Sequence, residues 1–192
     1  MSWRISALLI LFTLVSCVKK EEVALKDDRT PFLISTEELL EIHQRESIKI
    51  FDFRKKEAYE NSHIIDAIQI WRDDIVDDSY PYGGMMAKPE QMEELFSRLG
   101  IRSTDILVIY DDKGLCEAAR LWWILQNYNF DQVRLLEGGL DKWEAHHGTI
   151  SKKVPEFTES DFKFSGKPSM KYYVSKEAVM AAMEYQTLID TR

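Results

Sequence analysis

The residues most able to do chemistry lie in the stretch ILVIYDDKGLCEAARLWWIL, residues 106–125. Its first five residues are apolar and predict a strand, and a polar turn then leads into a helix. Turns between a strand and a helix hold the reactive atom in many α/β enzymes. The first residue after the strand is an acid, Asp111, and the nearest sulfur belongs to Cys116. Between them lie four further candidate site residues, Asp112, Lys113, Gly114 and Leu115.

Cys116 is the candidate nucleophile of this turn, but its sequence neighbours disfavour the reactive thiolate. Asp111, Asp112 and Glu117 place negative charge around it. Lys113 offsets that charge only in part. Two interpretations remain: a surrogate or resolving thiol, or a small, partly buried side chain in the first helical turn. We favour the second, because thiolate activation needs exposure and positive neighbours.

The remaining residues that could bind a metal show no suitable spacing. The spacing of the four histidines along the chain does not match a zinc-binding motif. We expect His63 to have a structural role. The acidic run DDIVDD, residues 73–78, lacks the ligand order of a calcium loop and is typical of a solvated turn. The sequence predicts neither a metal site nor a cofactor.

The composition of the chain bears on its domain number and on which partners it could bind. The chain has 192 residues, a formal net charge of −8 and 45% hydrophobic residues. That length is ample for one buried core and short for two. Nucleic-acid binding needs clustered Lys and Arg, and no basic stripe occurs, so we expect no nucleic-acid partner.

The N-terminus predicts a lipid anchor. Residues 1–17, MSWRISALLILFTLVSC, have one positive charge and an apolar stretch too short to span a bilayer but suited to a secretory signal. The signal ends in LVSC, which resembles a bacterial lipobox and makes Cys17 the predicted lipidation site; the alternative is an ordinary signal with a chance cysteine. Residues 18–31 then form a charged tether. We expect a protein of the bacterial cell envelope, lipid-anchored to a membrane and facing the periplasm or the surface.

From residue 32 to residue 150, helical and strand patterns alternate. Strands are expected at residues 48–53, 67–70, 105–110 and around 133–136, with 105–110 at the sheet centre. Helices are expected at residues 35–44, 88–100, 115–128 and 139–147. This alternation predicts an α/β fold, a doubly wound parallel sheet with helices on both faces and functional loops at the carboxyl ends of its strands.

The last forty residues indicate a second, incomplete unit. Residues 151–172 lose the periodic pattern and are expected to form an interdomain linker. Residues 175–192 then repeat the design of residues 35–54: a Ser cap, an early Glu, an amphipathic helix and a strand ending Asp-x-Arg. We expect residues 173–192 to begin a truncated second domain.

Several segments, in this order, resemble the rhodanese family and specifically the N-terminal half of the two-domain sulfurtransferases. They are IKIFDFR, HIIDAI, RDDIVDDSYPYGGMMAKPEQMEELFSRLGI, VIYDDKG, AARLWWIL and LLEGGLDKW, within about residues 33–145. The resemblance implies a rhodanese-like fold. In active members a cysteine follows the central strand, and loop N–H groups stabilise its thiolate and its persulfide. HIIDAI departs from the family's usual His-Ile-Pro-Gly-Ala.

Asp111 occupies the position of that cysteine, and a carboxylate cannot accept a sulfane sulfur. The resemblance therefore implies an inactive domain of a thiosulfate or 3-mercaptopyruvate type sulfurtransferase, with the persulfide-forming cysteine in a second rhodanese domain. That second domain would be its partner and would meet the small sulfur donor and acceptor. The alternative is an inactive binding or docking module of the cell envelope. YPYGGMM, residues 80–86, is expected to face the other domain.

Overall fold

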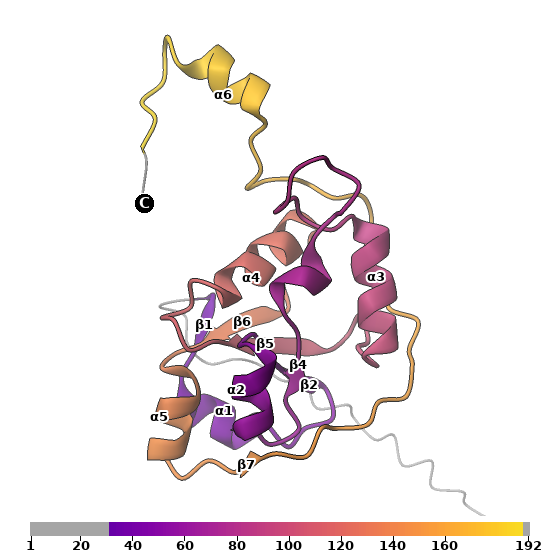
Figure 1. The fold of residues 1–192 in the computed structure, drawn as a ribbon, viewed down its shortest axis with the longest axis vertical. Coiled ribbons are helices and arrows are strands. Elements are labelled where there is room, and N and C mark those ends of the chain that lie inside the picture. The colour runs from indigo at the N-terminus through magenta and orange to yellow at the C-terminus, as the bar shows by residue number, and fades with distance from the viewer. Residues whose placement is uncertain (1–30, 190–192) are drawn as a thin grey trace, which may run out of the picture.

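The computed structural model describes residues 31–189 and contains a five-stranded sheet (Figure 1). The strands are β1 (Leu33–Ile34), β2 (Ile48–Asp52), β4 (Ile68–Gln69), β5 (Ile106–Tyr110) and β6 (Val133–Leu136). All of them are parallel, in the order β1-β6-β5-β2-β4. The predicted doubly wound α/β architecture is confirmed, with the strand from residues 105–110 at its centre.

The helices cover both faces of this sheet. They are α1 (Thr36–Ile42), α2 (Lys56–Asn61), α3 (Pro89–Arg98), α4 (Ala118–Asn127) and α5 (Gly139–Ala145), together with a 3-10 turn, η1 (Arg72–Ile75). A further helix, α6 (Lys176–Ala182), lies outside this arrangement. A two-stranded antiparallel pair, β3 (His63–Ile64) with β7 (Ile150–Ser151), lies beside the main sheet. Ser35 caps α1 in the expected capping box with Glu38.

The central strand separates two apolar clusters. Leu107 and Ile109 of β5 pack on one face with α3 and α4, whereas Val108 and Tyr110 pack on the other face with α1 and α5. Alternate residues of a strand point to opposite faces, so a strand buried on both sides is apolar throughout. This is why the run ILVIY marks the middle of the sheet.

The start of α4 differs from the sequence expectation. A helix was expected from Leu115, but the first helical residue is Ala118. Gly114 and Leu115 have left-handed backbone conformations, with φ of +65° and +72°. A helix cannot include such residues, so α4 cannot begin at Leu115.

The segment after β7 packs on the domain without forming a helix or strand. Residues 152–173, called the strap below, have no regular secondary structure. Phe162 is nevertheless fully buried and contacts the rings of Phe96 and Phe130, and Phe164 packs beside them. The strap thus completes one face of the core, while its role as an interdomain linker stays a prediction.

The C-terminal helix extends from the rest of the molecule (Figure 1). Ser175 caps α6 as expected, and none of the helix residues is buried. The strand expected after it does not form in residues 187–189, which have no neighbouring strand to pair with among the described residues. Asp190 and Arg192 of the predicted repeat lie outside the described residues, as do Cys17, the predicted signal and the tether up to residue 30. Within residues 31–189, no helix has the length and apolar character needed to cross a bilayer.

Candidate functional site

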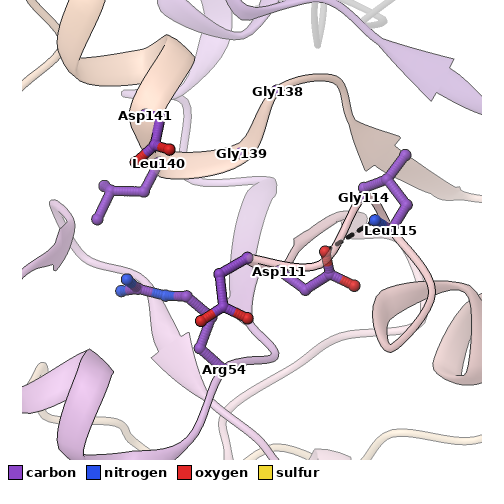
Figure 2. A pocket seen from close by; sticks show the side chains of 9 residues that line it. Arg54, Asp111, Gly114, Leu115, Gly138, Gly139, Leu140 and Asp141 are labelled. Carbon is purple, nitrogen blue, oxygen red and sulfur yellow. Dashed lines mark hydrogen bonds between the residues drawn. The ribbon is translucent and has the colours of Figure 1, made fainter.

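Three loops meet at the carboxyl edge of the sheet and enclose a cavity of about 210 Å³ (Figure 2). The cavity lies where the ends of β2, β5 and β6 converge, the position at which open parallel sheets bind ligands. Its lining residues are Arg54, Asp111, Asp112, Gly114, Leu115, Gly138, Gly139, Leu140 and Asp141.

The Asp111 carboxylate fills the centre of the loop that follows β5. Its Oδ1 accepts the N–H groups of Lys113 at 2.9 Å and Leu115 at 2.8 Å. Its Oδ2 accepts those of Glu117 at 2.8 Å and Ala118 at 2.9 Å. The residue is only 4% exposed. The loop is therefore an anion cradle whose anion is a side chain of the same chain, and that side chain also satisfies the free N–H groups at the start of α4.

A close approach of glycine fixes the neighbouring loop against this cradle. A Cβ atom on Gly139 would lie 2.6 Å from the Asp111 carbonyl oxygen, and the φ of Gly139 is +55°. No other residue fits there without moving one of the two loops. The Gly138-Gly139 pair after β6 thus forms one wall of the cavity.

A buried ion pair holds Arg54 at the cavity. Its Nε and Nη2 donate to Asp52 at 2.9 and 2.6 Å, and Nη2 also donates to the Ser62 carbonyl at 2.6 Å. Tyr110 donates its hydroxyl hydrogen to Asp52 at 2.5 Å and accepts the N–H of Ile64. Burial acts to lower the pKa of Arg54, but the hydrogen bond and charge of Asp52 outweigh it and raise that pKa. Burial likewise raises the pKa of Tyr110, and the Asp52 charge adds to the rise.

The structure separates Cys116 from the cavity. Cys116 is exposed and precedes the first helical residue, so the expectation of a partly buried thiol within the first helical turn is wrong. The cause is again the left-handed backbone at Leu115, because it moves the helix start and leaves Cys116 in the loop. Cys116 is not among the residues that line the cavity.

The other predicted loop residues divide between the cavity and the surface. Asp112, Gly114 and Leu115 line the cavity. Lys113 contributes its N–H to the cradle, while its ammonium lies 3.7 Å from Glu117.

Several residues of the site are not predicted by the sequence pattern. Arg72 forms a bidentate ion pair with Glu117, in which its Nε and Nη2 donate to the two carboxylate oxygens. Hydrogen bonding to Glu117 raises the pKa of Arg72. The Asp-x-Arg signature was recognised as a repeat but not as the support of a cavity. The position of Arg54 directly after a buried strand was the signal that could have revealed its role.

His63 has the structural environment expected of it. It is fully buried, and its Nδ1 and Nε2 lie 2.8 and 3.1 Å from the carbonyl oxygens of Tyr59 and Lys153. Within residues 31–189, no group of three or more His, Cys, Asp or Glu side chains is arranged to hold a metal ion.

Comparison with known proteins identifies the family. A sequence model of the rhodanese-like domain matches residues 35–146, more than half of the chain. The chain belongs to the rhodanese-like domain family. The matched region includes the cradle, Arg54 and the Gly138-Gly139 turn, so the residues of the cavity described above lie within the matched part of this chain.

Relatives of this family include named sulfurtransferases. The 3-mercaptopyruvate sulfurtransferase of Escherichia coli K12 is 26% identical over 136 residues, which are 71% of this chain and 48% of the relative. A Mycobacterium leprae protein, SseA, provisionally named a thiosulfate sulfurtransferase, is 33% identical over 70% of this chain and 45% of its own length. The chain thus spans about half the length of the curated relatives it matches.

Solved structures agree with the fold. The crystal structure of SseA from Escherichia coli, a 3-mercaptopyruvate sulfurtransferase, superposes with a TM-score of 0.72 at 25% identity, covering 81% of this chain and 63% of that one. Tum1 from Saccharomyces cerevisiae superposes with a TM-score of 0.69 at 21% identity, covering 81% of this chain and 57% of that one. Both likenesses support the rhodanese fold.

Proposed function

We propose that this chain is the non-catalytic half of a rhodanese-family sulfurtransferase of the thiosulfate or 3-mercaptopyruvate type. One observation supports this most directly: the Asp111 carboxylate accepts all four N–H groups of the cradle. The names of the relatives support the sulfurtransferase class, and their greater length is consistent with a further domain.

The chemistry explains why such a half would not transfer sulfur by itself. In the proposed reaction, a thiolate attacks the sulfane sulfur of thiosulfate, the S–S bond breaks and sulfite leaves, and the enzyme retains a persulfide. An acceptor thiolate or cyanide then attacks the outer sulfur and restores the thiolate. Asp111 presents oxygen where sulfur is needed, and its charge is already compensated by the four donors. The domain's contribution would be to support a second domain that carries the cysteine.

A second rhodanese domain of the same protein is the partner we propose. Large apolar side chains of the C-terminal segment are exposed: Val174, Met180, Met183, Tyr185, Leu188 and Ile189. Tyr80 and Tyr82, in the segment expected to face that domain, are also exposed, by 42% and 60%. Such a concentration of apolar surface is typical of a face that another domain covers.

A docking module without any enzymatic role is the second candidate function. The same filled cradle favours it, because a loop neutralised by its own carboxylate needs no reactant. The two functions differ in one respect: only the first requires a persulfide-forming cysteine in the second domain.

The first experiment is a thiosulfate:cyanide assay on the 192-residue chain. We expect no thiocyanate formation above background, for the wild type and for Cys116→Ser alike. Turnover by the wild type that disappears in Cys116→Ser would contradict the proposal, because it would make Cys116 the sulfur carrier.

We also propose that Cys17 carries a lipid that anchors the protein to a membrane of the bacterial envelope. The LVSC sequence at residues 14–17 supports this. Cys17→Ala should release the protein from the membrane fraction of expressing cells, whereas Ser16→Ala, which keeps the cysteine, should leave it bound. Equal membrane retention of Cys17→Ala and the wild type would contradict the anchor.

A further inference from the structure

The cavity beside the cradle contains a buried cation with an unused edge. The Arg54 side chain is only 8% exposed, and its Nε and Nη2 are engaged by Asp52 and Ser62. No partner is recorded for its Nη1 among the described residues. Arg54 lines the cavity, and Figure 2 shows its side chain entering from the end of β2, with Leu140 and Asp141 across from it.

Two acidic side chains line the same cavity. Asp112 and Asp141 both line it and are exposed. Neither carboxylate has a cationic partner among the ion pairs of residues 31–189, and no lysine lines the cavity. Asp111 also lines it, but four N–H groups already occupy its oxygens.

These charges select the class of ligand. Asp52 compensates the Arg54 charge, so Asp112 and Asp141 leave the cavity with a net negative field, in which a simple anion binds more weakly than a molecule that also carries a cationic group. A simple cation would leave the free edge of Arg54 without an acceptor. A molecule with one anionic and one cationic group would satisfy both Arg54 and the two acids.

We propose that this cavity binds a small zwitterionic α-amino acid. Its carboxylate would accept hydrogen bonds from Arg54, and its ammonium group would face Asp112 and Asp141. The volume of about 210 Å³ is enough for an amino acid with a short side chain. Leu115 and Leu140 supply apolar contact for that side chain. The site needs no nucleophile and is independent of sulfur transfer.

The test is an NMR titration of the full 192-residue chain with L-alanine. We expect saturable shifts of the Gly114, Gly138 and Gly139 amide signals, with a dissociation constant on the order of 1 mM, as suits so small a ligand. Propionate, which lacks the ammonium group, and ethylammonium, which lacks the carboxylate, should each bind at least about tenfold more weakly. The proposal is overturned if L-alanine gives no saturable shift, or if propionate binds as tightly as L-alanine.

Substitutions test which side chains bind the two charged groups of the ligand. Asp141→Asn should weaken L-alanine binding by about tenfold, because it removes one of the two carboxylates that face the ammonium group. Glu144→Gln, an exposed change on the same helix and outside the cavity, should bind like the wild type. Arg54→Lys should weaken L-alanine binding as well. If that variant does not fold, the affinity of Asp141→Asn still tests the proposed site. Unchanged affinity in Asp141→Asn would overturn the proposal.

Discussion

At the scale of single residues, Asp111 determines what this domain can do. Its two oxygens satisfy four backbone N–H groups that a strand-to-helix turn otherwise leaves for a ligand or a thiolate. A carboxylate in that position stabilises the loop but cannot act as the sulfur-accepting nucleophile. The electrostatics that would activate a sulfur atom instead hold the loop closed around an inert group.

This account predicts a large loss of stability in Asp111→Asn. The amide keeps one acceptor oxygen and turns an NH₂ group toward two N–H donors, which are then left unpaired and buried. We expect the free energy of unfolding to fall by about 2–4 kcal/mol in urea titrations.

The matched control is Asp112→Asn, the adjacent exposed acid, which should change the free energy of unfolding by no more than about 0.5 kcal/mol. Equal stability of the two variants would show that the four hydrogen bonds do not hold the loop.

At the scale of elements, the strap is part of the domain core. Phe162 is fully buried between α3 and the loop after α4, against the rings of Phe96 and Phe130. Backbone bonds fix the strap on both sides of it, from Ser160 N to Ser97 O at 2.9 Å and from Met170 N to Asn127 O at 3.1 Å. A segment without regular structure therefore contributes to the stability of the fold.

Phe162→Ala should lower the free energy of unfolding by about 3–5 kcal/mol, because it leaves a cavity among packed aromatic rings. Phe157→Ala, in the same segment but exposed, should have a small effect by comparison. Chemical denaturation of both variants measures the difference, and similar values would show that the strap is only loosely attached.

The C-terminal end of α4 predicts a specific dependence on alkaline pH. Burial raises the pKa of Tyr128 to about 12, with the charges of Glu90 and Asp77 adding to the effect. The unfolded chain releases this phenol proton near pH 10 while the folded chain keeps it, so stability is full below pH 10 and falls as pH rises to about 12.

Tyr128→Phe should make this fall in stability shallower. At neutral pH it should reduce the free energy of unfolding by about 1 kcal/mol, because the hydroxyl no longer donates to the Ala87 carbonyl. Part of the fall remains, since the pKa of Tyr59 is also raised by burial to about 12. Urea unfolding at several pH values gives the comparison; a slope equal to that of the wild type would contradict the assignment, and the exposed Tyr82→Phe serves as control.

How far the sequence predicts this structure depends on whether a feature is local. The run ILVIY at residues 106–110 predicted the central strand, because burial on both faces requires a continuous apolar sequence. The start of α4 was misplaced, because the left-handed Leu115 follows from the hydrogen bonds to Asp111 and not from its own propensity. The burial of Phe162 and the cavity at Arg54 depend on contacts between distant segments, which no local pattern records.

At the scale of the whole molecule, the packed core of the described residues does not include the last helix. The sheet, both apolar clusters and the strap lie within residues 31–173, whereas α6 buries none of its residues. The apolar side chains that follow Tyr173 therefore add exposed surface and not stability.

Deleting residues 174–192 should leave the melting temperature within about 2 °C of the full chain, because few buried contacts are lost. The shortened chain should also self-associate less, as measured by analytical ultracentrifugation. A loss of several degrees would show that α6 packs on the domain in solution.

The intact mass of the protein after incubation with thiosulfate tests the central claim most directly. The wild-type chain should show no added mass, since Asp111 occupies the position of a sulfur carrier and cannot accept sulfur. Asp111→Cys places a thiolate before the same four N–H donors, and should gain the mass of one sulfur atom that cyanide then removes. Stoichiometric addition of sulfur to the wild-type chain would contradict the account.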